Sequence, residues 1–283
     1  MSHTGHEERD MNSAEPQPED NGTPDGAPAA VDVAGVSKVF NPGRSNEIKA
    51  LTGIDLRIDP GEFVTLIGPS GCGKSTLLRL IAALTGVTEG SVAVNGKTAD
   101  QARLDRDYSM VFQRAGLFDW RNVSRNIELP LELMGWKAAE RRERSAEMLD
   151  LVKLSEFARH HPAELSGGMQ QRVAIARAMS FHPQLLLMDE PFGALDEMTR
   201  EHMQNELLRI WAETQITVIF VTHSISEAVF LSTRVVVMSP RPGRISAVID
   251  VDLGERNEAT RDDPAYFSCV TAVRDALREG DES

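Results

Sequence analysis

The stretch Gly68-Pro-Ser-Gly-Cys-Gly-Lys-Ser-Thr76 decides the fold of this 283-residue chain. The β-prone run Phe63–Ile67 precedes it, and Leu77–Leu84 follows it with the apolar spacing of a buried helix. Strand, glycine loop and helix in this order form a phosphate cradle, because glycines let backbone N–H groups turn inward and the helix adds its positive end. The predicted nucleotide-binding residues are Gly68, Pro69, Ser70, Gly71, Cys72, Gly73, Lys74, Ser75 and Thr76.

Two acidic residues complete the predicted chemistry. The run between Gln184 and Asp189 is continuously apolar, which is typical of a central parallel strand that is buried on both faces. Ligands bind at the carboxyl ends of such strands, so Asp189 is predicted to hold the Mg²⁺ that the Ser75 hydroxyl also contacts. Glu190 is predicted to orient and activate the attacking water, and Lys74 supplies positive charge for the β- and γ-phosphates.

Composition limits the class of protein. A hydrophobic content of 41% allows a packed core, and no apolar run reaches the ~18 residues of a membrane-spanning helix. The net charge of −13 argues against nucleic acid and anionic lipid as partners. Residues 1–30 are acidic with few large apolar side chains, so we predict a disordered tail. Without an apolar export segment, a cytoplasmic location with reduced Cys72 and Cys269 is expected.

Strand-like and helix-like segments alternate along the rest of the chain. This alternation predicts an α/β fold with a mostly parallel sheet, interrupted by a helical pattern over Val123–Ser180. Asp263-Pro264 predicts the start of a final helix, which could pack on the sheet or on a second copy. The predicted strands are Val31–Phe40, Leu51–Ile58, Phe63–Ile67, Gly90–Gly96, Tyr108–Phe112, Gln184–Asp189, Val218–Val221, Arg234–Met238 and Ile245–Val251, and the predicted helices after the insertion are Asp196–Ala212 and Ser224–Leu231.

Two features permit more than one interpretation, and a third leads to a single prediction. Phe40 is either an ordinary core residue or an aromatic platform for a nucleotide base. Ser166, Gly167 and Gly168 stand where a long helix begins, so they either only cap the helix or form a second anion site. Cys72 lies within the glycine loop and is predicted to react with maleimide unless ATP shields it.

Six segments, in their order, resemble ABC-type ATPases. They are Gly68–Thr76, Gln113, Leu165–Met169, Leu185–Glu190, Ala194–Asp196 and His223. The resemblance implies a P-loop NTPase fold with a mostly parallel sheet core, an antiparallel β subdomain and a helical insertion. It implies an ATPase domain over residues 31–253, with a helical subdomain over about 114–180, followed by a C-terminal helical extension over 254–283.

The resemblance also implies roles that spacing does not show. Two copies would pair head to tail with two ATP molecules between them, and Ser166–Gly168 of one copy would contact the γ-phosphate held by the other. His223 would hold the γ-phosphate, and Gln113 would reach Mg²⁺ and the attacking water. Asp196 would communicate across the dimer, and Phe40 would stack on adenine.

Some segments resemble one group of ABC proteins, the nitrate, sulfonate and taurine importers. Asp189–Asp196 is similar to importer ATPases, and Met169 together with Met238–Ile245 is similar to this group, which includes importers of pyrimidine precursors. Leu117–Arg121 resembles the group's loop, although Asp119 replaces its usual proline.

The resemblance implies a peripheral ATPase subunit on the cytoplasmic face of the cell membrane. Its partners would be a second copy, an integral membrane permease and, indirectly, a solute-binding protein, with no nucleic acid. Phe118 and Trp120 are predicted to dock on the permease, although they and their neighbours Phe112 and Leu117 could instead be core residues. The alternatives are a non-transport ABC ATPase that acts on DNA or ribosomes and a metabolic P-loop kinase.

Overall fold

Two β-sheets organise the residues that the computed structural model describes, which are 1, 28–193 and 195–281. The strands are β1 (Val31–Phe40), β2 (Ile48–Ile58), β3 (Phe63–Ile67), β4 (Glu89–Val94), β5 (Lys97–Thr98), β6 (Tyr108–Phe112), β7 (Leu185–Asp189), β8 (Thr217–Val221), β9 (Arg234–Met238) and β10 (Ile245–Asp250). The helices are α1 (Lys74–Ile81), α2 (Ala99–Asp105), α3 (Val123–Leu133), α4 (Ala138–Leu151), α5 (Gly167–Met179), α6 (Glu197–Thr214), α7 (Ile225–Leu231) and α8 (Pro264–Asp281). Three short 3₁₀ turns are η1 (Ser155–Phe157), η2 (Pro162–Glu164) and η3 (Glu258–Asp262). The predicted disorder of residues 1–30 falls almost entirely outside the described residues.

The central sheet has the strand order β10-β9-β3-β8-β7-β6 in the described part of the chain. Strands β9, β3, β8, β7 and β6 are parallel, and β10 runs antiparallel to β9. Every residue of β3 and of β8 is buried, as expected for strands covered on both faces. The predicted α/β fold with a mostly parallel sheet is therefore confirmed.

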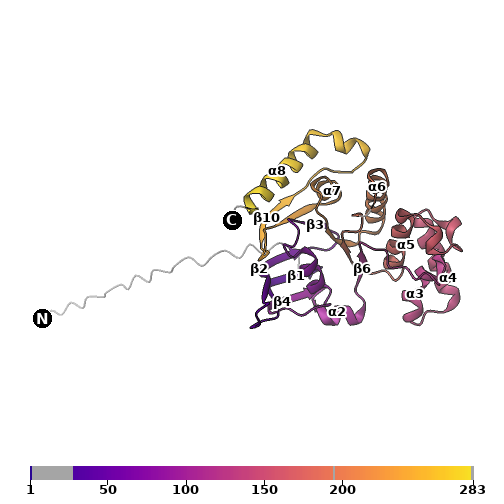
Figure 1. Cartoon of the computed structure of the whole chain (residues 1–283), viewed down its shortest axis with the longest axis horizontal. Helices are drawn as coiled ribbons and strands as arrows, with labels where there is room; N and C mark the ends of the chain where they lie inside the picture. The colour runs from indigo at the N-terminus through magenta and orange to yellow at the C-terminus, as the bar shows by residue number, and fades with distance from the viewer. Residues whose placement is uncertain (2–27, 194, 282–283) are drawn as a thin grey trace.

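Helix α1 lies between the two sheets. Alternate residues of β3 and β7, such as Leu66 and Leu187, join Leu77 and Leu78 of α1 in one buried cluster with β1 and β2. The second sheet, β2-β1-β4-β5, is antiparallel in each of its pairs. Figure 1 shows its strands on one side of the central sheet and helices α3, α4 and α5 on the opposite side.

Some boundaries differ from the sequence-based expectation. The helix after the glycine loop begins at Lys74 and ends at Ile81, because Ala83 has a positive φ of 45°. Helix α2 was not expected from the sequence, and Thr98 caps it by accepting a hydrogen bond from the backbone N–H of Gln101 at 3.3 Å. Among the described residues, none of the helices combines the length and the apolar character that a membrane crossing requires.

The C-terminal extension packs on its own chain. Helix α8 contacts α7, β9 and β10, and it lies beside α7 and β10 in Figure 1. Tyr266 and Val273 are its buried side chains, whereas Phe267 is 55% exposed. Of the two positions considered for this helix, the structure supports packing on the sheet.

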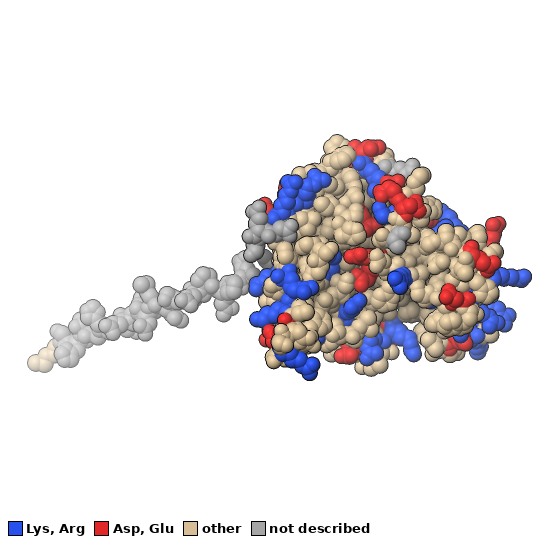
Figure 2. Space-filling model, in the orientation of Figure 1, with Lys and Arg blue, Asp and Glu red and all other residues tan. Residues whose placement is uncertain are grey.

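Charged side chains of both signs are scattered over the face shown in Figure 2. On the face shown in Figure 2, Lys and Arg are interspersed with Asp and Glu around a broad uncharged area. This view contains no continuous area of a single charge over the described residues.

Candidate nucleotide-binding site

A cavity of about 630 Å³ opens at the phosphate loop (Gly68–Thr76). The end of β1, the start of β2, the phosphate loop, the end of β7 and the turn between β9 and β10 all contribute to its wall. Its lining residues are Phe40, Asn41, Ile48, Ala50, Ser70, Gly71, Gly73, Lys74, Ser75, Thr76, Glu190 and Arg241. Eight of the residues predicted to act at the site therefore share one cavity, and four others contribute to it.

The phosphate loop holds the Lys74 ammonium with its own backbone. Nζ donates hydrogen bonds to the carbonyl oxygens of Gly68 and Pro69 at 2.8 and 3.1 Å, and the side chain is 5% exposed. None of these bonds goes to a carboxylate in the described structure, so no acidic partner cancels the positive charge. The charge stays available for a phosphate.

Glycine is required where the loop enters α1. Gly73 has φ +109°, and a Cβ there would lie 2.5 Å from Leu51 Cδ2. Gly68 has a different constraint, because its Cβ would lie 2.6 Å from the carbonyl oxygen of Met238. A side chain at either position would force the loop away from the strands that hold it.

The predicted magnesium ligands Ser75 and Asp189 meet across the sheet. Ser75 Oγ donates a hydrogen bond to Asp189 Oδ1 at 2.7 Å, which joins the start of α1 to the end of β7. A hydroxyl and a carboxylate at this distance, beside a phosphate cradle, fit a Mg²⁺ whose other ligands are phosphate oxygens and water. The side chains present are therefore suitable for the ion.

The three predicted catalytic residues follow neighbouring strands. Glu190 comes directly after β7 and His223 two residues after β8, and their atoms Oε2 and Nδ1 are 3.7 Å apart. Gln113 follows β6 and lies against the turn after Glu190, since a Cβ on Gly193 would be 3.0 Å from Gln113 Nε2. The carboxyl ends of parallel strands bring these polar groups to one edge, as the sequence predicts.

Glu190 is held in an unusual backbone conformation. Its φ is +47°, a region that residues with a Cβ rarely occupy, and its N–H donates to the carbonyl oxygen of Val221 at 3.0 Å. Such conformations persist where the surrounding structure fixes them, and they gather at functional sites. Glu190 lines the cavity from this position.

Phe40 contributes to the cavity wall and is not a core residue. Its side chain is 37% exposed, and the Lys38 ammonium lies 5.0 Å from the centre of its ring. An exposed ring beside a phosphate cradle is suited to stacking on a base. Of the two interpretations from the sequence, the core position is excluded.

The signature segment (Leu165–Met169) lies outside this cavity. Ser166 is exposed and caps α5 by accepting a hydrogen bond from the Met169 N–H at 3.3 Å. Gly168 is packed so closely that a Cβ would be 2.5 Å from Thr199 Cγ2. Asp196 caps α6 by accepting from the Thr199 N–H at 3.0 Å, and this hydrogen bond lowers the pKa of Asp196. The segment and Asp196 thus form one packed unit.

The Cys72 thiol is buried, and Cys72 is not among the residues that line the cavity. Its side chain is 1% exposed and belongs to the buried cluster around α1, with Sγ 3.7 Å from Lys74 Nζ. The expectation that maleimide reaches this thiol without ATP is therefore wrong in this conformation. The reason is that the loop turns the side chain away from the cavity.

Arg241 belongs to the site although the sequence analysis did not assign it a role. Its Nε and Nη2 donate to the Gly71 carbonyl oxygen at 3.3 and 3.2 Å, and the side chain lines the cavity. The available signal in the sequence is the turn Pro240–Arg244, which leads into the last strand. Nothing local to that turn indicates that it contacts a loop 170 residues earlier.

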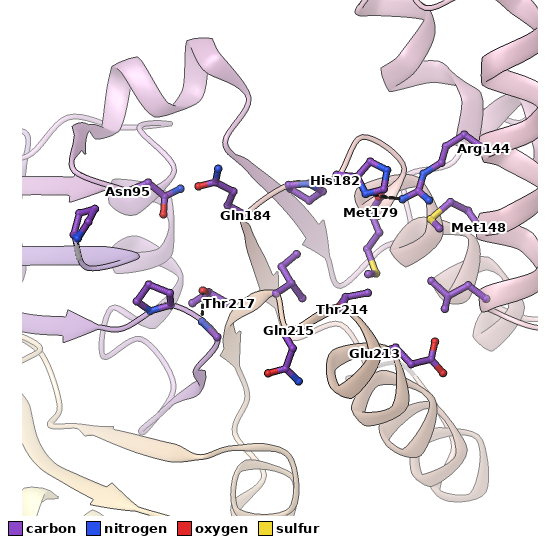
Figure 3. A pocket seen from close by; sticks show the side chains of 16 residues that line it. Asn95, Arg144, Met148, Met179, His182, Gln184, Glu213, Thr214, Gln215 and Thr217 are labelled. Carbon is purple, nitrogen blue, oxygen red and sulfur yellow. Dashed lines mark hydrogen bonds between the residues drawn. The ribbon is translucent and has the colours of Figure 1, made fainter. Parts of the chain in front are cut away.

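A larger cavity of about 770 Å³ opens at the opposite, amino-terminal ends of the strands. Figure 3 shows Arg144 and Met148 on its helical side and Asn95 on the side of the antiparallel sheet. None of the predicted site residues is among the described residues that line it. Because open α/β sheets bind ligands at the carboxyl ends of their strands, we assign the nucleotide to the smaller cavity.

Comparisons with known proteins agree with this geometry. A model of the ABC transporter family matches residues 51–193. The taurine import ATP-binding protein of Rhizobium johnstonii is 48% identical over 232 residues, which cover 82% of this chain and 87% of the relative. The nitrate import ATP-binding protein of Synechocystis sp. is 42% identical over 255 residues, which cover 88% of this chain and 95% of the relative.

Solved structures are similar over most of the fold. A dimeric bacterial ABC transporter cassette is 37% identical with a TM-score of 0.69, covering 78% of this chain and 99% of its own. An ATP-binding cassette dimer in a post-hydrolysis state, bound to ADP and Pi, is 36% identical with a TM-score of 0.68 and the same coverage. The phosphate loop, the strand end at Asp189–Glu190 and these similarities lead to one conclusion. The chain belongs to the ABC transporter family and is an ABC-type ATPase.

Proposed function

We propose that this ATPase energises the uptake of a small solute through a membrane permease. The observation that carries the proposal is the separation of the two predicted anion-binding elements. The cavity holds Lys74 and Ser75, whereas Ser166 is exposed outside it, at the amino-terminal end of α5. A second copy, placed head to tail, would bring its Ser166–Gly168 to the phosphates held by Lys74.

The reaction would use positioning and charge. Lys74 would bind the β- and γ-phosphates, Phe40 would stack on adenine, and Glu190 would take a proton from the attacking water. His223, 3.7 Å from Glu190, would hold the γ-phosphate, and Gln113 would orient the water. ATP would close the two copies together, and loss of the γ-phosphate would release them.

Mg²⁺ fits the pair formed by Ser75 and Asp189, with Gln113 as a further ligand. When bound, the ion would supply charge neutralisation between the β- and γ-phosphates. The chain's part is to present the Ser75 hydroxyl and the Asp189 carboxylate 2.7 Å apart at the mouth of the loop.

The experiment for the paired site uses the hydrolysis-deficient Glu190→Gln protein with MgATP. We expect a dimer on size-exclusion chromatography, and we expect Ser166→Arg in this background to abolish the dimer while ATP binding persists. Ser155→Arg, also at an exposed serine that begins a helical turn of the same subdomain, is the matched control and should remain dimeric. A dimer that tolerates Ser166→Arg would exclude the composite site.

The relatives' names support an importer. By those names they import taurine, nitrate or aliphatic sulfonates, so we propose a solute of that kind, or a pyrimidine precursor as in related importers. A solute-binding protein would deliver it, and the ATPase would sit at the cytoplasmic face of the membrane.

The loop after β6 is the proposed permease contact. Trp120 is 75% exposed, and its ring centre lies 4.8 Å from that of the half-buried Phe118. Buried Asn126 fixes this loop, because Oδ1 accepts from the Phe118 N–H and Nδ2 donates to the Phe118 carbonyl oxygen. Leu117, by contrast, packs against the core. The pair therefore offers an apolar surface on a rigid loop.

Co-purification tests this contact. Trp120→Ala should remove the permease from affinity-purified ATPase without lowering ATP binding. Leu133→Ala, which removes another exposed apolar side chain of the helical subdomain, should not. Equal permease recovery with both variants would contradict the contact.

A further inference from the structure

A buried carboxyl group is hydrogen-bonded to Thr222, the residue that precedes His223. Glu227, on the first turns of α7, is 5% exposed, and its Oε2 accepts a hydrogen bond from the hydroxyl of Thr222. Thr222 is 2% exposed, and its N–H donates to the Leu66 carbonyl oxygen at 3.3 Å, next to the phosphate loop. Thr222 thus joins His223 to both α7 and the central sheet.

The hydrogen bonds converge on this carboxyl group from two sides. Gln204 of α6 is 3% exposed, and its Nε2 donates to Glu227 Oε1 at 3.1 Å. Thr222 Oγ1 accepts from the Ser224 N–H at 3.0 Å, which leaves its own proton for Glu227. Both neighbours therefore donate to the carboxyl oxygens, and when Glu227 is ionised neither can be replaced by an acceptor without opposing two oxygen atoms.

Arg261 of the C-terminal extension fixes the orientation of the Gln204 amide. Its Nη2 donates to Gln204 Oε1 at 2.6 Å, which forces the Nε2 of that amide toward Glu227. The guanidinium is itself held, because it lies 3.7 Å above the Phe230 ring and its Nε is 4.0 Å from Glu201 Oε1. Without this donor, the amide of Gln204 could turn and present its oxygen to the carboxyl group.

We propose that Arg261 and Gln204 are positioning residues that set the orientation of His223 through Glu227 and Thr222. The C-terminal extension then contributes to ATP hydrolysis, although it lies outside the nucleotide cavity. The inference rests on the proposed role of His223 in holding the γ-phosphate.

The test compares full-length variants in steady-state hydrolysis of MgATP. Arg261→Ala and Gln204→Ala should each lower kcat by about three- to tenfold, the effect of losing one hydrogen bond, with the KM for ATP unchanged. The double variant should be no slower than either single variant, because both changes interrupt the same chain. Arg256→Ala is the matched control, since this arginine of the same extension donates to the carbonyl oxygens of Ser232 and Val251 instead. Its kcat should stay near that of the wild type.

A second measurement separates this inference from the proposed function. The imidazole proton resonance of His223, assigned by its absence in His223→Ala, should shift in Arg261→Ala and Gln204→Ala but not in Arg256→Ala. An unmoved resonance, or wild-type kcat in Arg261→Ala, overturns the positioning role. Wild-type kcat in His223→Ala, by contrast, would refute the proposed role of His223 itself. Thermal unfolding of each variant confirms that the compared proteins are folded.

Discussion

Gly243 packs closely against Cys72 of the phosphate loop, and we predict that this packing stabilises the loop. A Cβ at this position would lie 1.9 Å from the Cys72 carbonyl oxygen, where ordinary contact begins at 3.4 Å. The glycine also donates to the Ala50 carbonyl oxygen at 2.9 Å and accepts from the Thr52 N–H at 3.1 Å. Gly243→Ala must therefore displace a backbone that both hydrogen bonds hold, at a cost of about 3 kcal/mol in the free energy of unfolding.

The expected result is a joint loss of stability and nucleotide affinity. A change of this size should lower the melting temperature by about 6–12 °C, and movement of Cys72 should weaken ATP binding by about tenfold. Differential scanning calorimetry and titration with a fluorescent ATP analogue measure the two effects. Gly86→Ala is the matched control, because its φ is ordinary and a Cβ would meet nothing within 4 Å. If Gly243→Ala behaves like Gly86→Ala in both assays, the reasoning is refuted.

Three further predictions concern single side chains. Glu190→Gln should lower kcat by about 10²- to 10⁴-fold and leave ATP affinity intact. Rapid phosphate release by this variant would exclude Glu190 as the general base. Phe40→Ala should weaken ATP binding by about 1–3 kcal/mol but leave tripolyphosphate binding unchanged, and equal losses for the two ligands would contradict base stacking. Burial raises the pKa of Glu227 above its ordinary 4.5, so the contribution of Glu227 to the free energy of unfolding falls as pH rises from 4.5 through the raised pKa. Glu227→Gln should therefore gain stability relative to the wild type with rising pH, and urea unfolding that shows a constant difference would count against this shift.

Local patterns predicted the part of the site that lies at strand ends. The apolar runs before Gly68 and Asp189 are long enough to be read as buried strands, and parallel strands bring their carboxyl ends together. The contact between Ser75 and Asp189 therefore follows from the pattern, although 114 residues separate them. The same reasoning explains why Gln113 and His223 come close to Glu190.

The exposure of Phe40 could not be read from the sequence. Strand β1 starts with buried Val31 and Val33, but its pairing with β2 shifts register three times between Val33 and Val39. Each shift breaks the period of two on which an inside or outside assignment depends. The side of the strand that carries Phe40 is thus decided by pairing, not by alternation.

Contacts that polar side chains make with distant segments could not be predicted from the sequence either. Arg241 with Gly71 and Arg261 with Gln204 join segments whose own patterns give no reason for the pairing. From the sequence alone, an arginine in a turn is expected to be a solvated charge. Its position is determined only by the packing of β10 and α8. These contacts therefore depend on tertiary structure.

The short connection from Glu190 to Asp196 joins the predicted general base to α6, the helix that contacts the signature segment. Phe192 anchors it in the core with 1% exposure, and the Gly193 N–H donates back to the Glu190 carbonyl oxygen at 3.2 Å. At its far end, Asp196 caps α6, whose Thr199 packs on Gly168 of the signature segment. Arg200 of α6 also donates to the Phe192 carbonyl oxygen at 3.5 Å. The residue predicted to activate water and the surface predicted to meet the partner's ATP are therefore joined by contacts through α6. In the proposed dimer, we expect a partner that binds Ser166 to affect hydrolysis in both cavities through these contacts.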